Sequence, residues 1–149
     1  AGTTYVNHTA SRTLTQANLD TTYTTITATN NRDERDERIM LRPELLMVPA
    51  DLRATARELL ESELKPGGAN NDINANQGLL TALVNPYLSD TTGWFIGSPK
   101  GVKVFDSGAP EFRTWFDEPT QTIWVSATTH IGAMVTDWRQ WYACDVAAS

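Results

Sequence analysis

The hydrophobic pattern organises the chain around residues 41–68, which read as a buried strand, a sharp turn and a helix in succession. Four consecutive apolar residues at 45–48 predict a strand covered on both faces, because a half-buried strand would alternate. Pro49 ends the strand, and Asp51 is suited to cap the helix. Lys65 suits the last turn, and the Pro-Gly-Gly after it stops the helix. Apolar residues recur between these ends at helical spacing and form one stripe, made of Leu52, Ala56, Leu59, Leu60 and Leu64.

Helical spacing also predicts a helix over residues 14–30, with Thr15 as its cap and Asn30 at its end. Leu14 is placed to pack on Leu19 across the first turn. Short apolar runs predict strands at 79–84, 93–97, 102–104, 131–136 and 138–146. We expect the first of these strands to be buried and the third to have one face in water.

Residues 111–128 have the pattern of an antiparallel hairpin. Two alternating arms, 111–117 and 122–128, flank Glu118-Pro119-Thr120, which is a good turn sequence. In the second arm, Ile123, Val125 and Ala127 are predicted on one face, and Trp124, Ser126 and Thr128 on the other. No internal repeat or linker divides the chain.

Composition narrows the class of protein. The length of 149 residues suits one domain, or one body with a smaller lobe. A net charge of −6 argues against general affinity for nucleic acid, and no apolar run is long enough to span a bilayer. The single cysteine, Cys144, excludes an internal disulfide framework and a four-cysteine zinc site, and is compatible with production in the cytosol. Because the sequence begins at Ala1 rather than Met, we expect the gene product to be longer.

Two polar stretches resemble binding sites only in part. Residues 32–38 (RDERDER) contain three arginines, but four acids offset them, which favours a solvated loop with local ion pairs. Asp72, Asn74 and Asn76 imitate the start of a calcium loop, but the required glycine and glutamate are replaced by Gln77 and Leu83. We therefore predict an exposed, turn-rich loop there.

The catalytic candidates lack convergent partners. His8 and His130 have no neighbouring signature of a base or metal ligand. Cys144 is a possible nucleophile with His130 as base, although its apolar neighbours favour a packed strand. The segment Gly97 to Gly101 (GSPKG) lacks the spacing of a nucleotide-binding loop. Possible glycosidase carboxylates are Asp106, Glu111, Asp117 and Glu118, and five tryptophans could line a sugar cleft, although core positions are commoner. We assign no catalytic, cofactor-binding or metal-binding residue.

Three segments carry a family resemblance. Residues 42–49 (RPELLMVP) form a strand that ends in Val-Pro before a helix. Residues 85–88 (NPYL) are followed by the apolar residues at 94–96. The last segment contains Gly132, Val135, Asp137, Arg139 and Tyr142. In this order, over about residues 14–146, they resemble the C-terminal two-thirds of a tailed-bacteriophage major capsid protein of the Hong Kong 97-like fold. The similarity is to the branch with Mu-like head subunits and protease-fused capsid proteins.

The resemblance implies an α+β fold, with a mixed or antiparallel sheet and two or more helices in one compact fragment. A peripheral-type lobe would comprise about residues 14–68 and 102–149, and an axial-type lobe about residues 69–101. The implied role is a structural subunit of the icosahedral head shell of a phage or prophage, enclosing packaged DNA, and not an enzyme. The implied partners are other capsid subunits in hexamers and pentamers, with no cofactor and no membrane. The implied location is the virion, after assembly in the bacterial cytoplasm.

The resemblance also carries an expectation about assembly. The arm, extended loop and spine helix that clamp neighbouring subunits in the family should precede residue 14 and are absent from this sequence. We therefore expect residues 1–149 to be a soluble monomer, or at most weakly ring-forming. The alternative function is a β-rich domain that binds or hydrolyses carbohydrate through its tryptophans and acids.

Overall fold

The computed structural model describes residues 6–65 and 72–145, which fall into two compact units. The first unit comprises residues 1–101 and 137–149, and the second comprises residues 102–136. The peripheral-type and axial-type lobes expected from the resemblance stay predictions. Strands from residues 69–101 are hydrogen-bonded to the strand at Leu45–Val48 within one sheet of the first unit.

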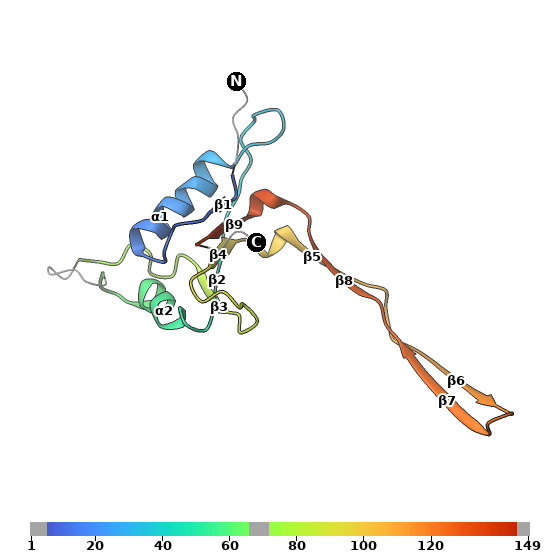
Figure 1. The fold of residues 1–149 in the computed structure, drawn as a ribbon. Coiled ribbons are helices and arrows are strands. Elements are labelled where there is room, and N and C mark those ends of the chain that lie inside the picture. Colours follow the sequence, from blue (N-terminus) through green and yellow to red (C-terminus); the bar gives the residue numbers. More distant parts are fainter. Residues whose placement is uncertain (1–5, 66–71, 146–149) are drawn as a thin grey trace. The chain divides into compact units, whose positions relative to one another are not determined.

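The first unit contains a mixed five-stranded sheet, which can be followed in Figure 1. Its strands, in spatial order, are β1 (His8–Thr9), β9 (Trp141–Cys144), β4 (Trp94–Gly97), β2 (Leu45–Val48) and β3 (Thr81–Val84). The outer pairs β1–β9 and β2–β3 are parallel, and the inner pairs β2–β4 and β4–β9 are antiparallel. Together with two α-helices, this sheet confirms the predicted α+β class with a mixed sheet.

Helix α1 (Gln16–Thr24) runs directly into a π-helical turn (Thr25–Thr29) that ends at Asn30. The predicted cap is confirmed, because the Thr15 hydroxyl accepts a hydrogen bond from the Asn18 amide. The hydroxyls of four threonines donate to the carbonyl four residues earlier: Thr21, Thr22, Thr25 and Thr27. Such bonds compete with the regular helix and tend to bend it, which accounts for the widened last turn. Leu19 and Ile26 are buried, as expected of apolar residues at helical spacing.

Helix α2 (Arg53–Glu61) is shorter than predicted at both ends. It begins after Leu52, whose side chain makes no cap bond, so the prediction of Asp51 as cap was wrong. The entry is a turn closed by the Arg53 amide on the Ala50 carbonyl, which replaces a side-chain cap. Ser62 is extended, so Leu64 and Lys65 lie beyond the helix and Leu64 is exposed. The core of the stripe is confirmed: Ala56, Leu59 and Leu60 are buried. The predicted Pro-Gly-Gly stop lies outside the described residues.

The core of the first unit lies around β2, β4 and β9. Along β2, Leu46 and Val48 are fully buried whereas Leu45 and Met47 are only half-buried, so the two faces are covered unequally. Strand β4 was predicted correctly and is the most buried, with Trp94 and Ile96 fully inside. Residues 79–84 were predicted to form a buried strand. A strand, β3, forms there, but its residues are only exposed or half-buried. Strand β3 is an edge strand, so it has a neighbour on one side only.

The second unit is a nested hairpin of two antiparallel ladders. Strand β5 (Val102–Asp106) pairs with β8 (Ile131–Val135), and β6 (Glu111–Asp117) pairs with β7 (Thr122–Thr128). The hairpin around residues 118–120 is therefore confirmed. Every residue of the unit is exposed except Asp117 and Ser126, which are half-buried. Strand β5 was expected to keep one dry face, but both of its faces are exposed because β8 pairs along its edge and no other part of the unit packs on either face.

Candidate functional site

The segment that imitates a calcium loop is a helix-capping device. The Asn74 side-chain amide donates to the Leu59 carbonyl at 2.8 Å and to the Ser62 carbonyl at 3.0 Å, where α2 ends. The Asn76 amide donates to the Asp20 carboxylate at 2.6 Å, which ties the loop to α1. Both asparagines are buried, so the predicted exposed loop was wrong at these positions. The Asn74 amide therefore satisfies carbonyls that the helix leaves unpaired.

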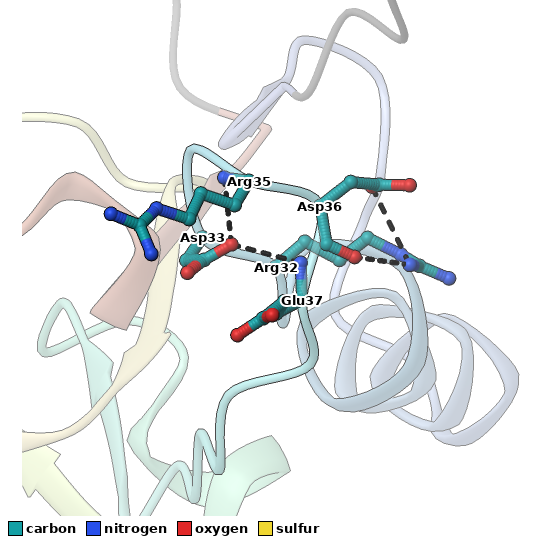
Figure 2. Close-up of polar contacts among 5 residues, drawn as sticks. All are labelled: Arg32, Asp33, Arg35, Asp36 and Glu37. Carbon is teal, nitrogen blue, oxygen red and sulfur yellow. Dashed lines mark hydrogen bonds and ion pairs between the residues drawn. The ribbon is translucent and has the colours of Figure 1, made fainter.

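The arginine- and acid-rich loop at 32–38 is held by local contacts, as predicted. The Asp33 carboxylate accepts from the main-chain amides of Arg35 and Glu37, both at 2.8 Å, as Figure 2 shows. Arg32 pairs with Asp36 at 3.4 Å and also donates to its carbonyl. Asp36 adopts a left-handed conformation with a φ of 63° at the turn. The charges therefore shape a tight solvated turn instead of forming a cationic patch.

Cys144 lies fully inside the first unit, where it behaves as a packed small residue. Its sulfur is 3.6 Å from the Thr22 hydroxyl. Burial raises the pKa of the thiol to about 11, from its ordinary value of 9.0, with the Thr22 contact opposing the shift only in part. Because the thiolate is the nucleophilic form, this environment makes Cys144 inert at neutral pH. These observations favour the interpretation of Cys144 as a packed strand residue over its interpretation as a catalytic nucleophile.

Neither histidine forms part of a catalytic arrangement. His8 lies half-buried in the short strand β1. His130 lines an open hollow of the second unit together with Asp106 and Ser107, which superficially resembles a triad. What joins Ser107 to His130 is a main-chain hydrogen bond of 3.1 Å, and Asp106 accepts from the Gly108 amide. The imidazole therefore orients neither side chain.

The acids proposed for glycoside hydrolysis serve local structure. Glu111 pairs with Arg113 at 2.9 Å, and Asp117 accepts from the Thr120 hydroxyl at 2.6 Å. Glu111 and Asp117 occupy opposite ends of β6, so they are about 20 Å apart at roughly 3.3 Å per residue. Paired glycosidase carboxylates lie about 5–10 Å apart. This pair cannot flank one glycosidic bond.

The tryptophans are divided between the two units and make different local contacts. Trp94 is core, and its indole donates to the Arg12 carbonyl at 2.7 Å. Trp115 and Trp124 stack on each other in the β6–β7 hairpin. Arg139 lies over the ring of Trp138. Trp141 packs in the first unit. The indoles therefore serve separate local structures, and the core prediction holds for Trp94.

The segment GSPKG is a packing cradle, a role that the sequence pattern did not indicate. A Cβ added at Gly97 would lie 2.5 Å from the Gln140 carbonyl and 2.6 Å from the Trp141 ring. A Cβ at Gly101 would lie 2.8 Å from the Gln140 side chain and 3.0 Å from Trp141. Both glycines are therefore required by the close approach of the indole and its neighbour. The glycine pair was visible in the sequence, but its neighbours Gln140 and Trp141 lie about 40 residues further along the chain, so its role could not be inferred.

One open hollow of about 300 Å³ lies in the first unit. Its charged side chains are Arg42, Glu44 and Lys100, and Ser98 and Gln140 add polar groups. It contains no histidine or cysteine that would supply a base or nucleophile at neutral pH. Within residues 6–65 and 72–145, no three His, Cys, Asp or Glu side chains are grouped to hold a metal ion. No helix in the same segments is long and apolar enough to cross a bilayer.

Comparisons with known proteins give a family. Among solved structures, a chain of the satellite phage P4 procapsid including size determination (Sid) protein is similar, with 13% identity and a TM-score of 0.46. The alignment covers 87% of this chain and 38% of that chain, so the present chain spans well under half of its length. No curated protein matches. A family model described as phage capsid protein matches residues 1–144. Because that match extends over nearly the whole sequence, the chain belongs to the phage capsid protein family.

Proposed function

We propose that the chain is part of a structural subunit of an icosahedral tailed-phage or prophage head, in the Hong Kong 97-like branch. The observation that carries this proposal is the family match over residues 1–144. The proposed role is mechanical: copies associate into hexamers and pentamers, and the closed shell encloses packaged DNA in the virion. Assembly is proposed to take place in the cytoplasm of the bacterial host, without a membrane or cofactor.

The side-chain arrangement supports a structural role over an enzymatic one. The best nucleophile, Cys144, is buried with a raised pKa, and the carboxylates of β6 are engaged in local contacts. Acidic net charge is also compatible with a wall that contains DNA without adhering to it, since adhesion needs basic surface. The peripheral-type and axial-type names for parts of the chain stay predictions, now to be tested on the two observed units.

Particle composition tests the proposed role directly. Phage particles are purified from the source host, and their shell proteins are identified by peptide mass spectrometry. We expect peptides from residues 1–149 among the most abundant shell proteins. Particles that lack these peptides would overturn the proposal. Stabilisation of the chain by oligosaccharides in the same preparation would instead favour the carbohydrate-binding alternative, which the spread of tryptophans and acids does not favour.

A further inference from the structure

The β6–β7 ribbon has one face that is entirely uncharged. Residues directly opposite each other in an antiparallel pair share a face, and the register pairs Phe112 with Ala127, Thr114 with Val125, and Phe116 with Ile123. These six residues are called the apolar face below. The other face carries Glu111, Arg113 and Asp117 around the stacked Trp115–Trp124 pair. The ribbon is therefore amphipathic, as a sheet is when one side is normally covered.

Nothing within the second unit covers the apolar face. The exposed fractions of Phe112, Phe116, Ile123 and Val125 are 72%, 56%, 67% and 68%. At about 150–250 Å² per aromatic residue, the two phenylalanines alone leave about 200–300 Å² of apolar surface in water. The aliphatic side chains bring the face to the size of the largest apolar patches on ordinary monomers, about 300–600 Å². A two-stranded ribbon is at best marginally stable in water, so covering this face would also stabilise the hairpin.

We infer that the apolar face packs against the same face of a second copy of this chain. This inference rests on the proposed function, because a shell subunit meets copies of itself. The face is self-complementary, since six uncharged side chains meeting six uncharged side chains leave no unpaired charge. Two such ribbons can pack as facing sheets about 10 Å apart, with the Trp115–Trp124 pair on the outer side.

The size of the face sets the strength of the contact. A stable interface buries about 800 Å² on each partner, and this face offers less. The contact is therefore weak between two free chains and becomes strong where a closed shell repeats it. From the sequence we expected a monomer, or at most weak ring formation. The apolar face changes that expectation to a monomer at low concentration that pairs at high concentration.

Matched cysteine variants test which faces meet. Val125→Cys places a thiol at the centre of the apolar face, and Thr128→Cys places one on the opposite face of the same strand. The native Cys144 is buried, so the introduced thiol is the reactive one, and the unchanged chain is the background control. A bis-maleimide with a reach of about 10 Å matches the spacing of facing sheets. We expect Val125→Cys to give covalent dimers about tenfold faster than Thr128→Cys when the chain is near 1 mM.

A charge pair provides the second measurement. Val125→Asp should remove concentration-dependent association in sedimentation equilibrium, whereas Thr128→Asp should retain it. Near-ultraviolet circular dichroism of the Trp115–Trp124 stack checks that both variants keep the hairpin. Equal trapping at both cysteines, or no trapping and no association at about 1 mM, would overturn the inference. Particle composition is measured independently of this contact. If the chain is present in virions but Val125→Cys is not cross-linked, only the proposed contact is overturned. If Val125→Cys is cross-linked but the chain is missing from virions, only the proposed role is overturned.

Discussion

The side-chain amide of Asn74 donates hydrogen bonds to the carbonyls of Leu59 and Ser62, at 2.8 and 3.0 Å. Helix α2 ends between these two residues, where its last carbonyls have no helical partner. A buried asparagine from a following loop therefore satisfies the helix end that its own main chain leaves open. The same residue fixes the loop through its side-chain oxygen, which accepts from the main-chain amide of Asn76 at 3.1 Å.

Replacing Asn74 by Ala should destabilise the chain by about 1–3 kcal/mol, because one buried and one part-buried carbonyl lose their donor. The measurement is urea unfolding followed by far-ultraviolet circular dichroism. Gln77→Ala is the control, since Gln77 is an exposed residue of the same loop. Equal stability of the two variants would contradict a capping role for Asn74.

Leu59→Ala should cost about 2–5 kcal/mol, as truncation of a buried leucine leaves a cavity. Leu64→Ala is the matched substitution, because Leu64 was part of the predicted stripe but is 48% exposed beyond the helix end. We expect the second change to alter the free energy of unfolding by no more than about 1 kcal/mol. The measurement is the thermal melt of both variants. Similar losses of stability would contradict a helix that ends at Glu61.

Gly97→Ala should destabilise the first unit by about 1–3 kcal/mol, because the new methyl group meets main chain and an indole ring that cannot move independently. Gly132→Ala is the control, since a Cβ there meets nothing within 4 Å and the main chain is not left-handed. Unfolding in urea compares the two. If Gly97→Ala were as stable as Gly132→Ala, the Trp141 ring would be able to shift away from the added methyl group, and glycine would not be required at position 97.

The buried thiol predicts a dependence of stability on alkaline pH. The pKa of Cys144 is about 11 in the folded chain against an ordinary 9.0, so the unfolded state loses its proton first as pH rises. Its contribution to stability is therefore constant below about pH 9 and declines from there towards pH 11. Cys144→Ala should show a smaller decline in the free energy of unfolding over that range. Native Cys144 should also resist alkylation at pH 7 until urea unfolds the chain.

Removal of divalent metal should leave the melting temperature unchanged. The amides of Asn74 and Asn76 already donate to Leu59, Ser62 and Asp20, so the partial calcium pattern is committed to protein contacts. Melts are recorded with a chelator and with added calcium. A large loss of stability in the chelator would mean that a bound ion supports the fold.

The sequence pattern correctly predicted the helices and strands that are determined by residues close together in the chain. Four consecutive apolar residues gave β2, a threonine before a helical stripe gave the cap of α1, and alternation gave both arms of the β6–β7 hairpin. The hairpin faces were also predictable, because register follows from the short turn. Burial was less accessible: β3 reads as a buried strand but lies at an edge, which depends on the order of strands in the sheet.

The contacts that sequence did not reveal connect distant residues. Asn74 caps a helix whose last carbonyls belong to residues 12 and 15 positions earlier, so a local motif search reads it as a metal loop. Gly97 is required by Trp141, which belongs to another strand. Conversely, Glu111 and Asp117 lie at opposite ends of β6, a separation that the predicted strand 111–117 already implied. Identity of the family followed from an ordered set of segments, none of which forms a chemical site.

The parallel pair β1–β9 places His8 opposite Ala143 and Thr9 opposite Cys144, and the Thr9 and Tyr142 hydroxyls meet at 2.6 Å. During synthesis, β1 therefore has no partner until β9 has left the ribosome. The β6–β7 hairpin joins Asp117 to Thr122 and can close while β9 is still inside the tunnel. The segment with the exposed apolar face is thus ready before the sheet that anchors it. Newly made chains therefore expose the apolar face of the hairpin before the five-stranded sheet is complete. In that interval they are most prone to aggregate, and a chaperone would have its largest effect.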